Sequence, residues 1–425
     1  MTRSQQWNPA LLLTLLVTTT GLCAVLIFAS LGQVAQAQPI IKTLTRQYDP
    51  VTITGAFVNV PNSQVFVYRL RNGGWQQIPF QIDEVSALGN YTSGNDGQID
   101  SNDELVFMSN QVGDKAGIDI ATVLPIRSRW YEVELTEPFS PTLKGWVYIV
   151  RSAVLTPTNQ TDEVTFDPAL RRITGHTYSI GWSNSFGGFD YTSIMTSGNI
   201  LDRSKTRITA PPFGTFSENS SLLSPNTMTL IKDGPVRVIT QQQGSNATKN
   251  VNLGYPNSLV IHSNIDLIHG PNVPITSVRF STDLTNTITN GTYYNENVSQ
   301  GVTIDGITDT VTSTLVRSWR QISLDQGSLI QVVALTGATG LQRHYYLDNR
   351  TRDPSDTGDQ RSYGDSGLEV VFPTGTLFTI TNTQYFLPNR QPNRGYEFYN
   401  YASDPLTVTI QLKGKFSFYL PTIIQ

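Results

Sequence analysis

Cysteine is almost absent from this chain of 425 residues. The single cysteine, Cys23, lies inside an apolar run near the N-terminus, so the remainder has no thiol for a disulfide or a thiolate metal centre. Histidine is also scarce, and the 4 histidines are scattered through the sequence without a paired ligand motif. Cysteines and paired histidines are the ligands that zinc and copper favour, so the sequence gives no indication of a soft-metal site.

Charge is the second thing in short supply. Charged residues make up 15% of the chain, and they form no basic cluster that could follow a phosphate backbone. Removing Arg3, the one charged residue among the first 37, from the 29 basic residues leaves 28 against 33 acidic residues, a net charge of −5. The composition therefore excludes nucleic acid as an expected partner.

Catalytic signatures are missing as well. There is no P-loop, dinucleotide fingerprint, H-E-x-x-H or G-x-S-x-G motif, and the "GDSG" at 364–367 has no histidine in a context suited to a serine protease. The sequence does not exclude a carboxylate pair for glycoside hydrolysis, because the distance between the two carboxyl groups depends on the fold and not on their spacing in the sequence. Asp83 with Glu84 and Asp103 with Glu104 are the pairs to test, although adjacent acids on a strand point to opposite faces. The catalytic residues are unknown at this stage.

Long amphipathic helical patterns do not occur either. Thr, Ser, Asn, Gln and Gly are abundant, 18 Tyr accompany 18 Phe, and short runs of β-branched and aromatic residues alternate with turn signals along the chain. The sequence therefore predicts an all-β protein built of β-sandwich modules. Because the strand pattern stops over residues 152–168, we predict a smaller N-terminal β module over 38–155 and a larger, supersandwich-like β unit over 156–425.

The first 37 residues have the pattern of an export signal. An apolar run over 10–32 follows Arg3, and Ala35 and Ala37 form an A-x-A site after it. Cleavage there would give a chain that starts at Gln38 and is secreted or held at the cell surface. The alternative is an uncleaved signal anchor, since the run reaches the ~20 residues that span a bilayer. Contact with a membrane is expected only in that second case.

The stretch "DGQIDSNDELVFM" at 96–108 resembles the second half of an EF-hand calcium loop. With Asp96 at position 5, Gly97 falls at position 6, Asp100 at 9 and Asp103 at 12. Positions 1 and 3 lack carboxylates, so the nearby "FQIDE" would have to supply oxygens. The alternative is a polar turn whose side chains bond their own backbone. The candidate calcium ligands are Asp83, Glu84, Asp96, Gln98, Asp100, Asp103 and Glu104.

A second acidic stretch runs from Asp348 to Glu369. Oxygen ligands on a long loop suit calcium, and the candidates are Asp353, Asp356 and Asp359. Against this, Arg350, Arg352 and Arg361 are interleaved with the acids and could neutralise them directly.

Three motifs carry a family resemblance. "FQIDE" (80–84), "DELVFM" (103–108) and "DGPVRV" (233–238) are similar to segments of an uncharacterised family of exported, β-rich bacterial proteins. "DGPVRV" also resembles strands of galactose-mutarotase-like and polysaccharide-lyase-like β-sandwiches, which would imply sugar handling.

The sequence leaves two hypotheses about function. The first is a calcium-stabilised surface or envelope protein that binds a polysaccharide or a cell-envelope component without catalysis. The second is a carbohydrate-active enzyme, a polysaccharide lyase or glycoside hydrolase.

Overall fold

The computed structural model describes residues 39–55, 59–117, 120, 130–158, 161–220, 227–243, 248–266, 274–337, 339–374 and 377–413. This part of the chain is nearly all β, as the sequence predicts, and its one α-helix is α2 (Gly395–Ser403). The proposed export signal lies outside the described residues. No helix within the described ranges is long and apolar enough to cross a membrane.

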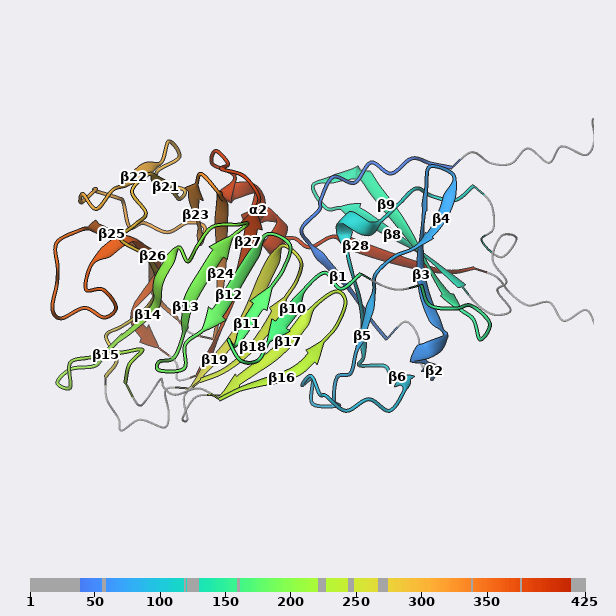
Figure 1. Cartoon of the computed structure of the whole chain (residues 1–425), viewed down its shortest axis with the longest axis horizontal. Helices are drawn as coiled ribbons and strands as arrows, with labels where there is room; N and C mark the ends of the chain where they lie inside the picture. The colour runs from blue at the N-terminus through green and yellow to red at the C-terminus, as the bar shows by residue number, and fades with distance from the viewer. Residues whose placement is uncertain are drawn as a thin grey trace, which may run out of the picture.

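The N-terminal module is a sandwich of two antiparallel sheets, with a short two-stranded ribbon beside them (Figure 1). Two 3₁₀ turns, η1 (Asn62–Gln64) and η2 (Ser109–Gln111), connect its strands. The five-stranded sheet has the order β28 (Thr407–Lys413), β8 (Trp130–Glu137), β9 (Ser140–Arg151), β3 (Val65–Arg71) and β4 (Gly74–Gln77). The three-stranded sheet has the order β1 (Pro50–Thr54), β7 (Glu104–Met108) and β5 (Gln81–Asp83), and the ribbon pairs β2 (Val60–Pro61) with β6 (Gln98–Ile99).

Alternating burial explains why these strands pack face to face. In β1, Val51 and Ile53 are buried whereas Thr52 and Thr54 are exposed, because successive side chains point to opposite faces of the sheet. The apolar face meets the five-stranded sheet in one core, to which β3, β7, β8 and β9 also contribute.

The larger unit has a nine-stranded sheet as one layer. Its order is β16 (Thr227–Asp233), β17 (Val238–Gln243), β18 (Thr248–Gly254), β19 (Ser258–Asp266), β27 (Leu377–Leu387), β24 (Gly327–Thr336), β23 (Trp319–Leu324), β21 (Gly291–Tyr294) and β22 (Val302–Ile304). Two sheets face it. One is five-stranded, with the order β15 (Thr215–Ser217), β14 (Leu201–Thr209), β20 (Ser277–Leu284), β26 (Ser362–Thr374) and β25 (Thr339–Asn349). The other is four-stranded, with β10 (Thr165–Asp167), β11 (Arg172–Thr174), β12 (Tyr178–Trp182) and β13 (Phe189–Ile194) in sequence order.

The last described strand crosses from the larger unit back to the N-terminal module. After α2, whose Phe398 is fully buried against Tyr385, β28 pairs antiparallel with β8 from Thr407 opposite Thr136 to Lys413 opposite Trp130. A division of the chain at residue 155 assigns β28 to the larger unit, whereas its hydrogen-bond partners lie in the N-terminal sheet. The N-terminal sheet therefore combines strands from both ends of the described chain.

A buried arginine holds this crossing in place. Arg46 donates from Nε and Nη2 to the two carboxylate oxygens of Glu137 at 2.8 and 3.0 Å. The same Nη2 donates to the backbone carbonyl of Asp404 at 2.8 Å, and the guanidinium lies 4.2 Å from the ring centre of Tyr401. One side chain thus ties the segment between α2 and β28 to the end of β8.

Candidate functional site

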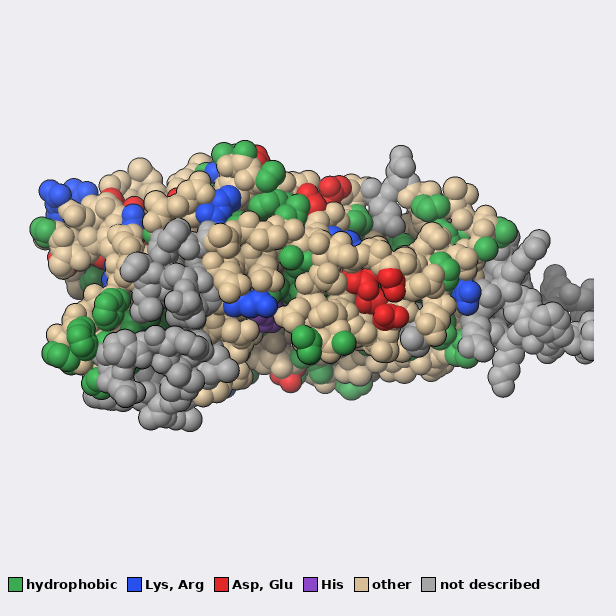
Figure 2. Space-filling view, turned by 90° about the horizontal axis from the view of Figure 1, so that it is seen from below, with side chains coloured by type: hydrophobic (Ala, Val, Ile, Leu, Met, Phe, Trp, Pro, Cys, Tyr) green, Lys and Arg blue, Asp and Glu red, His purple; other side chains and the backbone are tan. Residues whose placement is uncertain are grey.

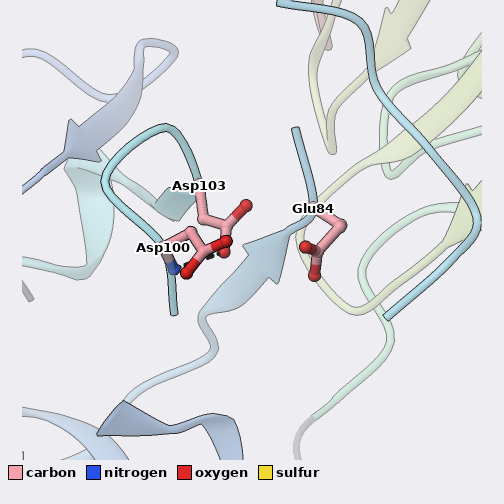
Figure 3. A group of neighbouring side chains, drawn as sticks. All are labelled: Glu84, Asp100 and Asp103. Carbon is pink, nitrogen blue, oxygen red and sulfur yellow. Dashed lines mark hydrogen bonds between the residues drawn. The ribbon is translucent and has the colours of Figure 1, made fainter. Parts of the chain in front are cut away.

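Three of the predicted calcium ligands meet at one point. Glu84 follows β5, and Asp100 and Asp103 lie on the loop between β6 and β7; one oxygen of each carboxylate lies within 4.8 Å of the others (Figure 3). The loops around β6 carry acidic side chains on the underside of the N-terminal module (Figure 2). Carboxylate oxygens brought together in this way are the donors that calcium prefers.

Asp103 fixes the local geometry of this acidic group. Its side chain is buried and accepts hydrogen bonds from the backbone N–H groups of Val85 at 3.0 Å and Asp100 at 2.7 Å. These two bonds hold the end of β5 against the loop before β7. Because Asp103 uses lone pairs on both oxygens for the backbone, Glu84 and Asp100 are the carboxylates with most capacity left for a cation.

The pKa of the Glu84 carboxyl reflects the excess of negative charge in this group. Desolvation raises the pKa of this carboxyl, and the negative charges of Asp103, Asp96 and Asp100 raise it further, while Lys232 acts in the opposite direction. Like charges at close range favour the protonated form. A divalent cation would relieve the same repulsion.

Asp96 and Gln98 belong to a turn beside the group. The Asp96 carboxylate accepts the backbone N–H of Gln98 at 2.8 Å, and Asn95 does the same for Gly97 at 2.7 Å. Gly97 has φ +82°, a left-handed conformation that favours glycine. Asp96 is not among the three grouped carboxylates. This half of the loop therefore has the self-bonded geometry of the polar-turn alternative.

Asp83 and Glu104 face a different partner. Arg237, which is 1% exposed, donates to Asp83 Oδ2 at 2.8 Å from Nε and to Glu104 Oε2 at 2.5 Å from Nη2. Tyr255 accepts a third bond from the guanidinium at 3.2 Å, and Tyr91 donates to Glu104 at 2.9 Å. These two carboxylates neutralise a buried arginine and are not part of the acidic group around Asp103.

The Arg237 network joins the two units of the chain. Asp83 and Glu104 are neighbours on β5 and β7, whereas Arg237 directly precedes β17 of the nine-stranded sheet. Gln81 strengthens the contact because its Oε1 accepts the backbone N–H groups of Val236 and Arg237. A shared apolar cluster surrounds the network: Val106, Met108, Val236, Ile239, Leu253 and Tyr255. The three motifs of the sequence resemblance thus meet at one structural junction.

The second acidic stretch contacts positively charged side chains that are distant from it in the sequence. Asp356 accepts Lys205 Nζ at 2.6 Å and Arg207 Nη2 at 2.7 Å, both from β14. The Asp353 carboxylate accepts a hydrogen bond from the backbone N–H of Ser355 in the same turn. The Asp359 carboxylate accepts one from the Asn286 side-chain amide at 3.0 Å. The interleaved arginines have no ion pair with these three acids among the described residues. The only sequence signal for this network is the alternation of Arg203, Lys205 and Arg207 on one face of β14.

Lys205 is the centre of a buried charge cluster. Its side chain has no exposed area and lies 2.6 Å from Asp283 and 3.8 Å from Asp365, in addition to Asp356. Desolvation, followed by the nearby Asp365 charge, raises the pKa of Asp283 well above its ordinary range. Because Asp283 is next to Thr282 on β20, the cluster lies on the outer face of the five-stranded sheet while Thr282 points inward.

A cavity of about 150 Å³ lies between the layers of the larger unit. The nine-stranded sheet contributes amide side chains to its wall, and the facing sheets contribute aromatic ones; the residues concerned are Gln242, Asn250, Asn382, Trp182, Phe189 and Phe280. The Oδ1 atoms of Asn250 and Asn382 are buried without a hydrogen-bond partner. Among the described lining residues there is no Asp, Glu or His. Sequence reasoning missed this cavity because an Asn- and Gln-rich strand looks solvent-facing.

No family model and no curated protein matches the chain. Solved structures give weak similarities. An α-N-acetylgalactosaminidase, NagBb, from Bifidobacterium bifidum in complex with Gal-NHAc-DNJ has a TM-score of 0.39 and 13% identity, with 55% of this chain and 39% of that chain covered. A β-arabinopyranosidase has a TM-score of 0.26 and 11% identity over 53% of this chain and 40% of that one. The chain thus spans about two fifths of the length of these glycosidases, and similarities of this size decide nothing about activity.

Proposed function

We propose that this chain is an exported, non-catalytic protein that binds carbohydrate in the cavity between the layers of its larger unit. The observation that carries the proposal is the composition of the cavity wall. Amide side chains can exchange hydrogen bonds with sugar hydroxyls, and aromatic rings can cover the apolar face of a sugar ring. Ligand sites commonly combine an apolar wall with a few fixed polar groups.

The same wall argues against the alternative, a glycoside hydrolase or lyase. Glycoside hydrolysis in most families needs two carboxyl groups that flank the scissile bond. The described cavity wall has none, and the buried carboxylates Asp283 and Asp365 are not among the lining residues and lie 2.6 and 3.8 Å from Lys205 Nζ. Binding without bond cleavage is the function that this geometry supports.

Replacing Asn382 with leucine tests the binding proposal. Leucine removes the amide from the wall at similar volume, so carbohydrate affinity should fall about tenfold or more through the lost hydrogen bonds. The measurement is isothermal titration with a panel of monosaccharides and polysaccharide fragments. Thr383→Leu, the next residue on β27 and on its other face, is the matched control and should bind as the parent does. Equal affinity in both variants, or no binding to any panel member, would remove the cavity as the site.

Export is the second part of the proposal. Because Ala35 and Ala37 form a small-residue site after the apolar run, secreted material should begin at Gln38. Mass spectrometry of the N-terminus of protein recovered from its native source would check this. An intact N-terminus on membrane-bound material would instead identify a signal anchor.

Calcium is the third part, and Glu84, Asp100 and Asp103 are its proposed ligands. Binding only to the folded state should stabilise the protein by about 2.7 kcal/mol at a hundredfold excess over Kd. Thermal melts with calcium and with chelator should then differ by several degrees. We expect a weak Kd, on the order of 10⁻⁴ to 10⁻³ M as in extracellular modules. Asp100→Asn should abolish the shift, whereas Asp96→Asn, on the turn beside the group, should keep it.

The calcium effect should also depend on pH. The raised pKa of Glu84 means that the folded state holds more protons than the unfolded state, so metal-free stability declines as pH rises through that pKa. Calcium replaces the proton and removes this loss. The difference between the two melts should therefore widen from acidic to neutral pH. A difference that is zero at every pH would leave the loop as a polar turn.

A further inference from the structure

Arg320 is a buried cation at the edge of the cavity. It lies on β23, where its backbone pairs with that of Gln331 on β24, and it is 7% exposed. Its Nε donates to Gln331 Oε1 at 2.7 Å and its Nη2 to Thr282 Oγ1 at 2.8 Å, a bond that spans the two layers. It lines both the large cavity and a neighbouring one of about 10 Å³, which is room for about one water molecule.

The guanidinium of Arg320 has no direct ion-pair partner among the described residues, and the charge of Asp365 acts on it only at longer range. Within the described part of the chain, no carboxylate lies within ion-pair distance of its guanidinium, and its Nη1 makes no hydrogen bond. The other deeply buried cations all have carboxylates: Arg46 has Glu137, Lys205 has Asp283 and Arg237 has Asp83. Burial lowers the pKa of Arg320 to about 10, so it stays charged at neutral pH. An isolated buried charge is strongly unfavourable unless something pairs with it.

Unsatisfied donors accompany the arginine. Gln331 and Gln384 are cross-strand neighbours, each 1% exposed, and the Nε2 atom of each is buried without a partner. On the cavity wall the unsatisfied atoms of Asn250 and Asn382 are acceptors instead. The unsatisfied donors thus lie on β24 and β27 beside Arg320. The acceptors follow farther along the same sheet, with Asn382 two residues from Gln384 on β27 and Asn250 on β18. A ligand with an anionic group at one end and hydroxyl groups at the other matches this distribution.

We propose that the cavity binds a sugar acid, with the carboxylate on the Arg320 guanidinium and the ring hydroxyls on the Asn250 and Asn382 amides. This inference rests on the proposed carbohydrate-binding function and names its ligand class. A cavity of about 150 Å³ admits a benzene-sized ring, so its volume is of the order that the ring of a sugar acid requires. The same chemistry is offered by a free sugar acid and by the terminal unit of an acidic polysaccharide.

Titration of the whole exported chain separates these cases. The probes are D-glucuronate and D-galacturonate, the neutral sugars D-glucose and D-galactose, acetate, and short oligogalacturonate fragments. The parent protein should bind at least one uronate, free or as a fragment end, ten times or more tighter than the matching neutral sugar and tighter than acetate. Binding of fragments alone would assign the polysaccharide end, and equal binding of monosaccharide and fragment would assign the free acid.

Arg320→Met is the decisive variant. It should lose the preference for acids while it keeps, or raises, the melting temperature, because it removes an unpaired buried charge. Arg279→Met, a half-buried arginine on β20 that lies over Tyr345, is the matched control and should keep the preference. If Arg320→Met does not fold, Thr282→Val, which removes the hydroxyl that orients Arg320, should weaken uronate binding without affecting neutral sugars.

The outcomes that overturn the inference differ from those that overturn the proposed function. Equal binding of acidic and neutral sugars by the parent would reject the acidic ligand and leave carbohydrate binding in place. A preference for acids that survives Arg320→Met would place their recognition elsewhere. Acetate binding as tight as that of the uronates would reject the sugar part. No binding of any probe would reject both proposals.

Discussion

Replacing Arg237 with methionine should lower the free energy of unfolding by about 3–5 kcal/mol, the usual cost of removing one partner from a buried ion pair. The loss arises because Asp83, 1% exposed, and Glu104 lose the guanidinium between them, and Asp83 keeps only Lys232, 3.4 Å away, as a counter-charge. The backbone contacts of Gln81 with Val236 and Arg237 would weaken as well. Urea unfolding followed by tryptophan fluorescence measures the effect.

A matched pair provides the control. Arg343 also bonds a carboxylate, Glu369 at 2.7 Å, but its side chain is 42% exposed. Exposed pairs contribute about 0–1 kcal/mol, so Arg343→Met should change stability little. Combining Arg237→Met with Asp83→Asn should recover part of the loss, since one of the two buried carboxylates that lost the guanidinium is then uncharged. Equal effects of Arg237→Met and Arg343→Met would contradict a stabilising role for the junction network.

Ending the chain after Asp404, which deletes β28, should unfold or aggregate the N-terminal module while the larger unit remains folded. The deletion removes the ladder from Thr407 to Lys413 and leaves β8 as an open edge, a template for pairing between chains. Leu406, Val408 and Ile410 also pack on the core of the module; they are partly buried, so each contributes less than the ~1.5–3 kcal/mol of a fully buried aliphatic side chain. Thermal melts should show one lost or lowered transition and one retained.

Point variants on β28 distinguish loss of the strand from loss of chain length. Ile410→Asp places a charge on the face that packs on the core, so it should reproduce much of the deletion's effect. Thr409→Asp, on the exposed face, should leave the melt near that of the parent. A deletion that melts as the parent does would mean that the N-terminal sheet is complete without β28.

The strand content could be predicted from sequence because its signal is local. In β1, alternation of Val51 and Ile53 with threonines predicts a half-buried strand. Alternation does not say which face is inside, however. In β18, Val251 and Leu253 pack toward the module junction, while Asn252 is fully buried and bonds Thr240 at 3.0 Å within the sandwich. A strand covered on both faces hides its polar side, and the cavity was missed for that reason.

The candidate sites also differ in whether their contacts are local in the sequence or bring distant segments together. Asp100 and Asp103 are close in sequence, and their meeting with Glu84 follows from a short loop, so local spacing was enough to select them. The partner of Asp83 is Arg237, more than 150 positions away. That of Asp356 is Lys205, equally remote. Carboxylates that look available in a sequence are therefore neutralised by cations that only the sheet topology brings near.

The return of β28 to the N-terminal module also sets an order of events in time. A chain is made from its N-terminus, and its early domains usually fold while synthesis continues. Here the sheet that begins with β3 must wait for the last described strand, since β8 gains its outer neighbour only when residues 407–413 exist. Contacts between distant segments also form slowly, because the intervening loop must close first. The first module made is thus the last to be finished, and a chain interrupted before β28 presents an incomplete sheet that proteases and chaperones can recognise.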